Sequence, residues 1–147
     1  MTLLSMARLI TTIPDDSVEE DDEIVEFGGR AVLAAITEVL RGLGYQVSEP
    51  VYAGAQGWQA VVSTERRKFF VQSQHIHTWC LLVSSDITGM WNKLFHKTAE
   101  SYAEFLKKLN RGLGADSRFT SVEWFDQSGD PFDESQAGTP EPVIQRV

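Results

Sequence analysis

A dense run of acidic residues near the amino terminus is the strongest constraint on how this chain can fold. Eight of the twelve residues from position 15 to position 26 are Asp or Glu, and none of the twelve is Lys or Arg. Carboxylates this close together repel one another and favour a solvated conformation. The sequence therefore predicts an exposed loop here, between an amino-terminal strand and the rest of the domain.

The acidity is local. Residues 1–64 hold ten acids and three bases, a net charge of −7, whereas residues 65–147 hold eleven acids and ten bases, a net charge of −1. Direct nucleic-acid binding is disfavoured, because neutralising phosphates requires a basic face. No apolar run approaches the roughly 20 residues that span a bilayer, which argues against a membrane partner. The amino terminus lacks a signal-peptide pattern, and the lone Cys80 lies in an apolar stretch, so a cytoplasmic protein with a buried thiol is expected.

Two amphipathic helices are the clearest local predictions. Residues 29–43 and residues 98–112 each carry apolar side chains on one stripe of a 3.6-residue period. Gly42 and Gly44 suit the left-handed turn that closes a helix, and Thr98 is a plausible N-cap. The stripes consist of Val32, Ile36, Val39, Leu40 and Leu43 in the first helix and of Tyr102, Phe105, Leu106, Leu109 and Leu113 in the second.

The remaining apolar segments are short and rich in β-branched and aromatic residues, as strands are. Their close spacing indicates hairpins rather than crossover connections. We expect strands at 6–13, 45–48, 58–62, 69–77, 79–84 and 118–126, with a short helix at 88–95. The predicted fold class is α+β, an antiparallel sheet of about five to six strands with two main helices packed on one face. Residues 1–126 form a single domain, and the Gly-, Ser- and Pro-containing residues 127–147 a flexible C-terminal tail.

No pattern in the sequence indicates catalysis, a cofactor or a metal. His75 and His77 point to the same face of a strand, and Cys80 and His96 could complete a set, but zinc sites have tighter and repeated ligand spacings. Two half-exposed strand histidines are the simpler interpretation. Apolar neighbours raise the pKa of a thiol such as Cys80, which leaves it inert. No Gly-x-Ser-x-Gly turn is present, and the acidic run lacks the alternating ligands of a calcium loop.

The layout resembles that of small bacterial immunity proteins, which are cytoplasmic inhibitors encoded beside secreted antibacterial toxins. The likeness lies in residues 44–58, in the charged turn leading into Lys68-Phe-Phe-Val-Gln72, and in the late helix and strand up to Trp124-Phe125. It implies that the acidic segment occludes the basic active-site cleft of a toxin, with an aromatic anchor nearby. The predicted partner-binding residues are Asp15, Asp16, Glu19, Glu20, Asp21, Asp22, Glu23, Glu26 and Trp58.

Two other functions stay open. A secretion chaperone or chaperone-like adaptor is also small, acidic and α+β, and would hold unfolded segments across its sheet. A small-ligand-binding or enzymatic domain would use the loop Tyr52–Gly57 and a pocket converging on His75, His77 and a carboxylate.

Overall fold

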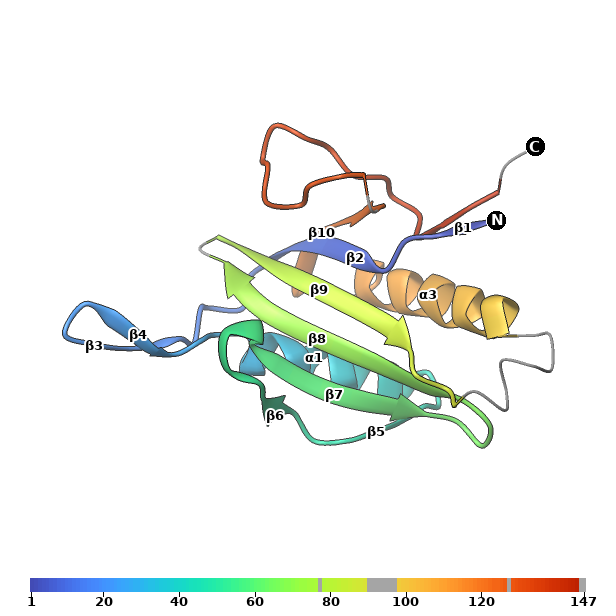
Figure 1. The fold of residues 1–147 in the computed structure, drawn as a ribbon, viewed down its shortest axis with the longest axis horizontal. Coiled ribbons are helices and arrows are strands. Elements are labelled where there is room, and N and C mark those ends of the chain that lie inside the picture. Colours follow the sequence, from blue (N-terminus) through green and yellow to red (C-terminus); the bar gives the residue numbers. More distant parts are fainter. Residues whose placement is uncertain (77, 90–97, 127, 146–147) are drawn as a thin grey trace.

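A seven-stranded antiparallel sheet forms the centre of the computed structural model (Figure 1), which describes residues 1–76, 78–89, 98–126 and 128–145. The strands lie in the order β10-β2-β9-β8-β7-β5, and β6 also pairs with β7, along the same edge as β5. They are β2 (Met6–Thr11), β5 (Gln46–Val47), β6 (Val51–Tyr52), β7 (Trp58–Ser63), β8 (Lys68–Ile76), β9 (Trp79–Asp86) and β10 (Phe119–Phe125). His77, His96 and most of the expected short helix at 88–95 lie outside the described residues.

The α+β class is confirmed, with one strand more than the five to six expected. The extra strand arises because the segment before the short helix η1 (Gly54–Gln56) divides into two pieces, each only two residues long. Both pieces pair with β7, at its two ends. The glutamate–proline step Glu49-Pro50 separates them, since proline cannot donate to a strand ladder.

Two helices cover one face of the sheet, α1 (Arg30–Gly42) and α3 (Thr98–Gly114) (Figure 1). Most of each predicted stripe faces inward, as Ile36 and Leu40 of α1 and Phe105 and Leu109 of α3 are fully buried. Leu43 is the exception, because it follows the end of α1 and is 41% exposed. Phe105 stacks on Phe69 of β8, with the ring centroids 4.4 Å apart. Because side chains alternate along a strand, one face of the sheet packs against the helices and the other face contacts other parts of the chain.

The carboxy-terminal residues form part of the fold, which corrects the prediction of a flexible tail for the described residues 128–145. We call this segment the C-terminal strap. At its end, β11 (Val143–Ile144) pairs with β1 (Thr2–Leu3). In its middle, Thr139 forms a bridge with Trp124 of β10, and Phe132 packs on Trp79 with ring centroids 5.5 Å apart. The strap lies against the face of the sheet that the helices leave uncovered.

One buried arginine holds the strap in place. Arg8 of β2 is only 7% exposed and points away from the helices. Its guanidinium donates to the carbonyl oxygens of Pro131 (3.1 Å), Asp133 (3.2 Å) and Gln136 (2.6 Å) and to a carboxylate oxygen of Glu123 (3.0 Å). The composition of residues 128–145 alone predicts a mobile segment. The bonds that order it come from Arg8, which lies more than a hundred positions away in the sequence, so the local composition does not reveal them.

Replacing Arg8 with Met should release the strap. Methionine keeps the apolar stem but removes every donor, and it leaves Glu123 without its cation. We expect a loss of about 2–4 kcal/mol in the free energy of unfolding, measured by chemical denaturation, and protease cleavage within residues 128–145. Arg41→Met is the control, because Arg41 forms an exposed ion pair with Glu49 that contributes little. Equal protease resistance of Arg8→Met and wild type would contradict this role.

Acid should loosen the same contact. The N–H of Gly138 and the Arg8 guanidinium lower the pKa of Glu123 below its ordinary value of 4.5. A lowered pKa means that this stabilisation is complete above the unfolded-state value and is lost as the pH falls through the folded-state value. Below about pH 4.5, wild type should therefore lose more stability than Glu123→Gln, as unfolding midpoints measured across the acid range would show. Parallel pH profiles would exclude a contribution from Glu123.

Candidate functional site

The acidic run forms a β-hairpin rather than the loop that its charge predicts. The hairpin joins β3 (Val18–Glu20) to β4 (Glu23–Glu26) through the two-residue turn Asp21-Asp22. Both turn residues have positive φ, 50° and 65°, as the tight turns that suit hairpins require. Aspartate adopts this conformation more readily than most residues. We call residues 18–26 the acidic hairpin.

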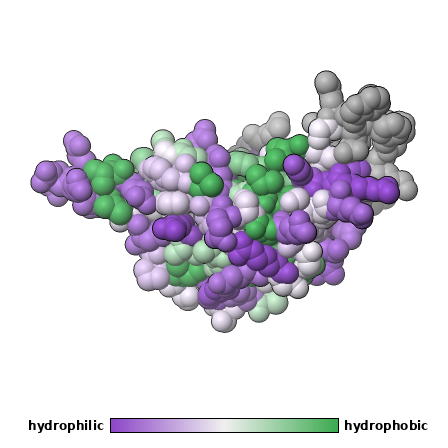
Figure 2. Space-filling model, turned by 90° about the horizontal axis from the view of Figure 1, so that it is seen from below, coloured by the Kyte–Doolittle hydropathy of each residue, from purple (hydrophilic) through white to green (hydrophobic). Residues whose placement is uncertain are grey.

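The acidic hairpin stands apart from the rest of the molecule. Its two strands form a separate sheet and project from one end of the central sheet (Figure 1). Every residue from Val18 to Val25 is exposed. Figure 2 shows the projection at its left end, where an apolar patch is flanked by hydrophilic residues. The exposed apolar side chains of the hairpin are Val18 (44%), Ile24 (47%) and Val25 (50%).

Negative charge is concentrated along the hairpin. Glu20 lies directly opposite Glu23 and Glu19 lies opposite Ile24, and the register then shifts before Val18, which pairs with Glu26. Like charges in directly opposed positions destabilise a strand pair. Within the part of the chain that the structure describes, no ion pair involves the hairpin carboxylates. The hairpin therefore carries a negative field that the described residues do not neutralise through ion pairs.

The first two acidic residues have a different role, because they anchor the base of the hairpin. The Asp16 carboxylate accepts the N–H of Gly29 (2.8 Å) and of Ala31 (2.9 Å) in the first turn of α1. It thereby caps a helix that begins fourteen residues later in the chain. Asp15 accepts the N–H of Ser17 (2.9 Å) and shapes the turn before β3. Both are predicted partner-binding residues whose oxygens make bonds within the protein.

Trp58, which is predicted to bind the partner, is also part of the anchor. Its side chain is only 8% exposed, and its indole N–H donates to the carbonyl of Phe27 (3.0 Å). The N–H of Phe27 in turn donates to the hydroxyl of Tyr52 (3.0 Å). The Arg30 guanidinium lies 5.3 Å from the centre of the indole ring. Trp58 and the loop that starts at Tyr52 hold the carboxy-terminal end of the hairpin against the sheet.

Other chemistry finds little support among the described residues. Burial raises the pKa of the Cys80 thiol to about 12, with Asp15 and Asp16 adding to the effect, so Cys80 is protonated. No group of three His, Cys, Asp or Glu side chains in the described ranges could hold a metal ion. No described helix is long and apolar enough to cross a bilayer.

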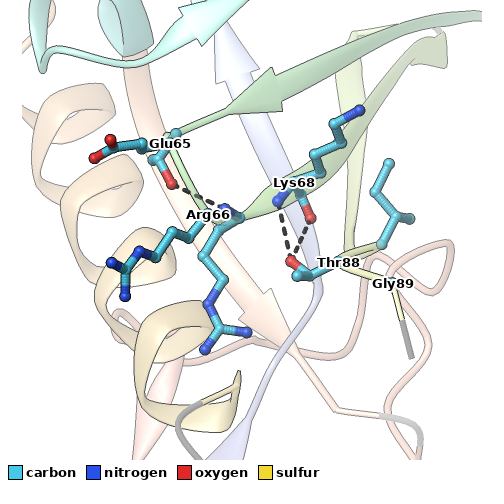
Figure 3. A pocket seen from close by; sticks show the side chains of 8 residues that line it. Glu65, Arg66, Lys68, Thr88 and Gly89 are labelled. Carbon is cyan, nitrogen blue, oxygen red and sulfur yellow. Dashed lines mark hydrogen bonds between the residues drawn. The ribbon is translucent and has the colours of Figure 1, made fainter. Parts of the chain in front are cut away.

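An open hollow of about 560 Å³ lies at the β7–β8 turn, opposite in charge to the hairpin. Three basic residues, Arg66, Arg67 and Lys68, line it together with Glu65. Thr88 also lines it and is bonded to Lys68, since its hydroxyl accepts the N–H of Lys68 (3.0 Å) and donates to the Lys68 carbonyl (3.1 Å) (Figure 3). Neither His75 nor Cys80 contributes to it.

The chain matches no family model and no curated protein. The acidic hairpin and its anchor are therefore the features that bear on function. Six of the predicted acidic residues, from Glu19 to Glu26, lie on this element, whereas Asp15, Asp16 and Trp58 support it. The three exposed β-branched residues were not predicted as contacts, although their presence within an acidic run was visible in the sequence.

The distinction between residues that anchor the acidic hairpin and residues in its exposed part is testable. Asp16→Ala should lower the free energy of unfolding by about 1 kcal/mol, because two N–H groups of α1 lose their acceptor. Glu19→Ala, in the exposed part of the hairpin, should change stability by less than about 0.5 kcal/mol. Chemical denaturation of the two variants checks this. If the two variants were equally stable, Asp16 would not be a structural cap.

Proposed function

We propose that this protein is a binding module, rather than an enzyme, and that it docks its acidic hairpin onto a basic surface of a partner protein. The observation that carries the proposal is a projecting hairpin with unneutralised carboxylates on a firmly bonded base. The charge steers the encounter and raises the association rate. The apolar residues Val18, Ile24 and Val25 then supply the short-range contact that loses water on docking.

The anchor matters for affinity as well as for position. Binding is weakened by the entropy lost when a mobile loop becomes ordered, and a preformed hairpin avoids much of this loss. Bonds from Asp16, Tyr52 and Trp58 hold both ends of the acidic hairpin before any partner arrives. The element therefore suits insertion into a preformed cleft better than wrapping around a convex surface.

The partner class that fits best is a secreted antibacterial toxin with a basic active-site cleft. In this proposal the protein acts in the cytoplasm of the producing cell as an immunity protein, and the hairpin blocks access of the toxin's substrate. The resemblance in layout to immunity proteins supports this class, and so does the narrow, projecting shape of the hairpin (Figure 1).

Neutralising the tip should slow association. The variant Glu20→Gln, Asp21→Asn, Asp22→Asn, Glu23→Gln removes four charges and preserves side-chain size. Its association rate with the partner at low salt should fall by roughly tenfold or more, whereas dissociation should change less. The partner is obtained by affinity capture from the host's own lysate at low salt, and the rates are measured by surface binding kinetics.

A charge-matched control separates local from global effects. Glu65, Glu100, Glu134 and Glu141 are exposed and lie outside the hairpin, so changing all four to Gln gives the same net charge as the tip variant. This control should bind almost like wild type. If both variants slowed association equally, only net charge would matter. If neither did so, the hairpin would not be the docking element.

A chaperone-like adaptor is the second candidate. Val61, Phe70 and Val83 lie half-buried on the sheet face away from the helices. A surface of this kind could hold an extended client. Capture of several partially unfolded proteins, unaffected by the tip variant, would favour this function over a toxin inhibitor. A single stoichiometric basic partner, lost at high salt, would favour the immunity protein.

A further inference from the structure

The outer edge of β10 is only partly covered. Its inner edge pairs with β2, and its outer edge is bridged at one point, where Trp124 and Thr139 exchange N–H···O bonds of 2.8 and 2.9 Å. Backbone groups in an antiparallel strand alternate between the two edges. Since Trp124 directs its N–H and carbonyl outward, Val122 does the same two residues earlier. No described residue bonds to the outer edge at Val122.

The chain's own strap does not continue along this edge. The residue that would pair with Val122 is Glu141, two positions beyond Thr139. The chain turns away instead, and the carbonyl of Pro142 accepts the N–H of Leu4 (2.7 Å). Asn110 of α3 donates to the Pro140 carbonyl (2.9 Å), and the chain then leaves to pair with β1. The strap thus shows that an antiparallel segment fits this edge, and it leaves the next pairing position open.

The open edge faces a groove rather than flat solvent. A hollow of about 320 Å³ is lined by Phe119–Val122 of β10, by Asn110, Arg111 and Gly114 of α3, and by Pro140. Arg111 is exposed and, among the described residues, is the only charged side chain that lines this hollow. A strand edge beside a helix, with unpaired N–H and carbonyl groups, is a template for one added strand.

We propose that this groove binds an extended peptide segment of a partner protein, as a strand antiparallel to β10 that pairs with Val122 and directs a carboxylate toward Arg111. A second copy of this chain fits less well, because it would bring its own α3 to the same place. A lone extended segment brings no such obstacle. This site is distinct from the acidic hairpin and does not depend on its function.

The test uses the full-length protein and a displayed library of random short peptides. Selected peptides should alternate β-branched residues and carry an acidic residue. Val122→Pro removes the outward N–H on an edge strand, where proline is tolerated, and should weaken the best peptide by about tenfold or more in fluorescence anisotropy. Arg111→Glu should weaken it similarly. Lys107→Glu, one turn away on the exposed side of α3 and outside the groove, should not.

Additional measurements make the peptide-binding test decisive. If Val122→Pro unfolds, the contrast between Arg111→Glu and Lys107→Glu decides, together with slowed hydrogen exchange of the Val122 amide when peptide is bound. The hairpin tip variant should bind the peptide normally, so this site and the hairpin fail separately. No selected peptide, or a peptide that binds Val122→Pro and Arg111→Glu as well as wild type, would overturn the proposal. Dimerisation of wild type that Val122→Pro abolishes would assign the edge to a second copy instead.

Discussion

A close backbone contact between Gly29 and strand β8 fixes where helix α1 begins and where the acidic hairpin leaves the body. Gly29 has a φ of 131°, and a side chain there would place its Cβ 2.5 Å from the carbonyl oxygen of Ser73. Beside it, the N–H of His75 donates to the Gly28 carbonyl (3.0 Å), and Asp16 caps the helix. Hairpin, helix and sheet therefore meet at one point, and only glycine permits the approach.

In the proposed function, the hairpin reflects a conflict between stability and binding. Its opposed glutamates repel each other, and its exposed valines and isoleucine gain nothing from burial in the monomer. Such local conflicts are expected where an element serves a partner rather than the fold. The bonds at the base of the hairpin offset this weakness, because they lie away from the repelling tip. They join Asp16 to N–H groups at the start of α1, and Trp58 and Tyr52 to the main chain of Phe27.

The two faces of the sheet are covered by different kinds of interaction. On one face, α1 and α3 bury continuous apolar stripes, and Trp124 adds a bond from its indole N–H to Asn110 (2.8 Å). On the other, the C-terminal strap depends on Arg8, whose guanidinium binds successive carbonyls as no apolar side chain could. This strap covers Trp79 and closes part of the β10 edge, so it limits where partners can add to the sheet.

The sequence by itself determined the features that depend on local pattern. The periods of 3.6 and 2 residues identified both long helices, the main strands and the α+β class, and the density of carboxylates ensured that residues 19–23 are exposed. Only the tertiary structure decided the features that depend on distant partners. Asp16 caps a helix because the start of α1 lies beside it. Trp58 is a buried structural residue because its indole N–H reaches the carbonyl of Phe27. The carboxy-terminal segment became a strap because Arg8 reaches Gln136, a residue 128 positions away, and no local pattern encodes a bond over that separation.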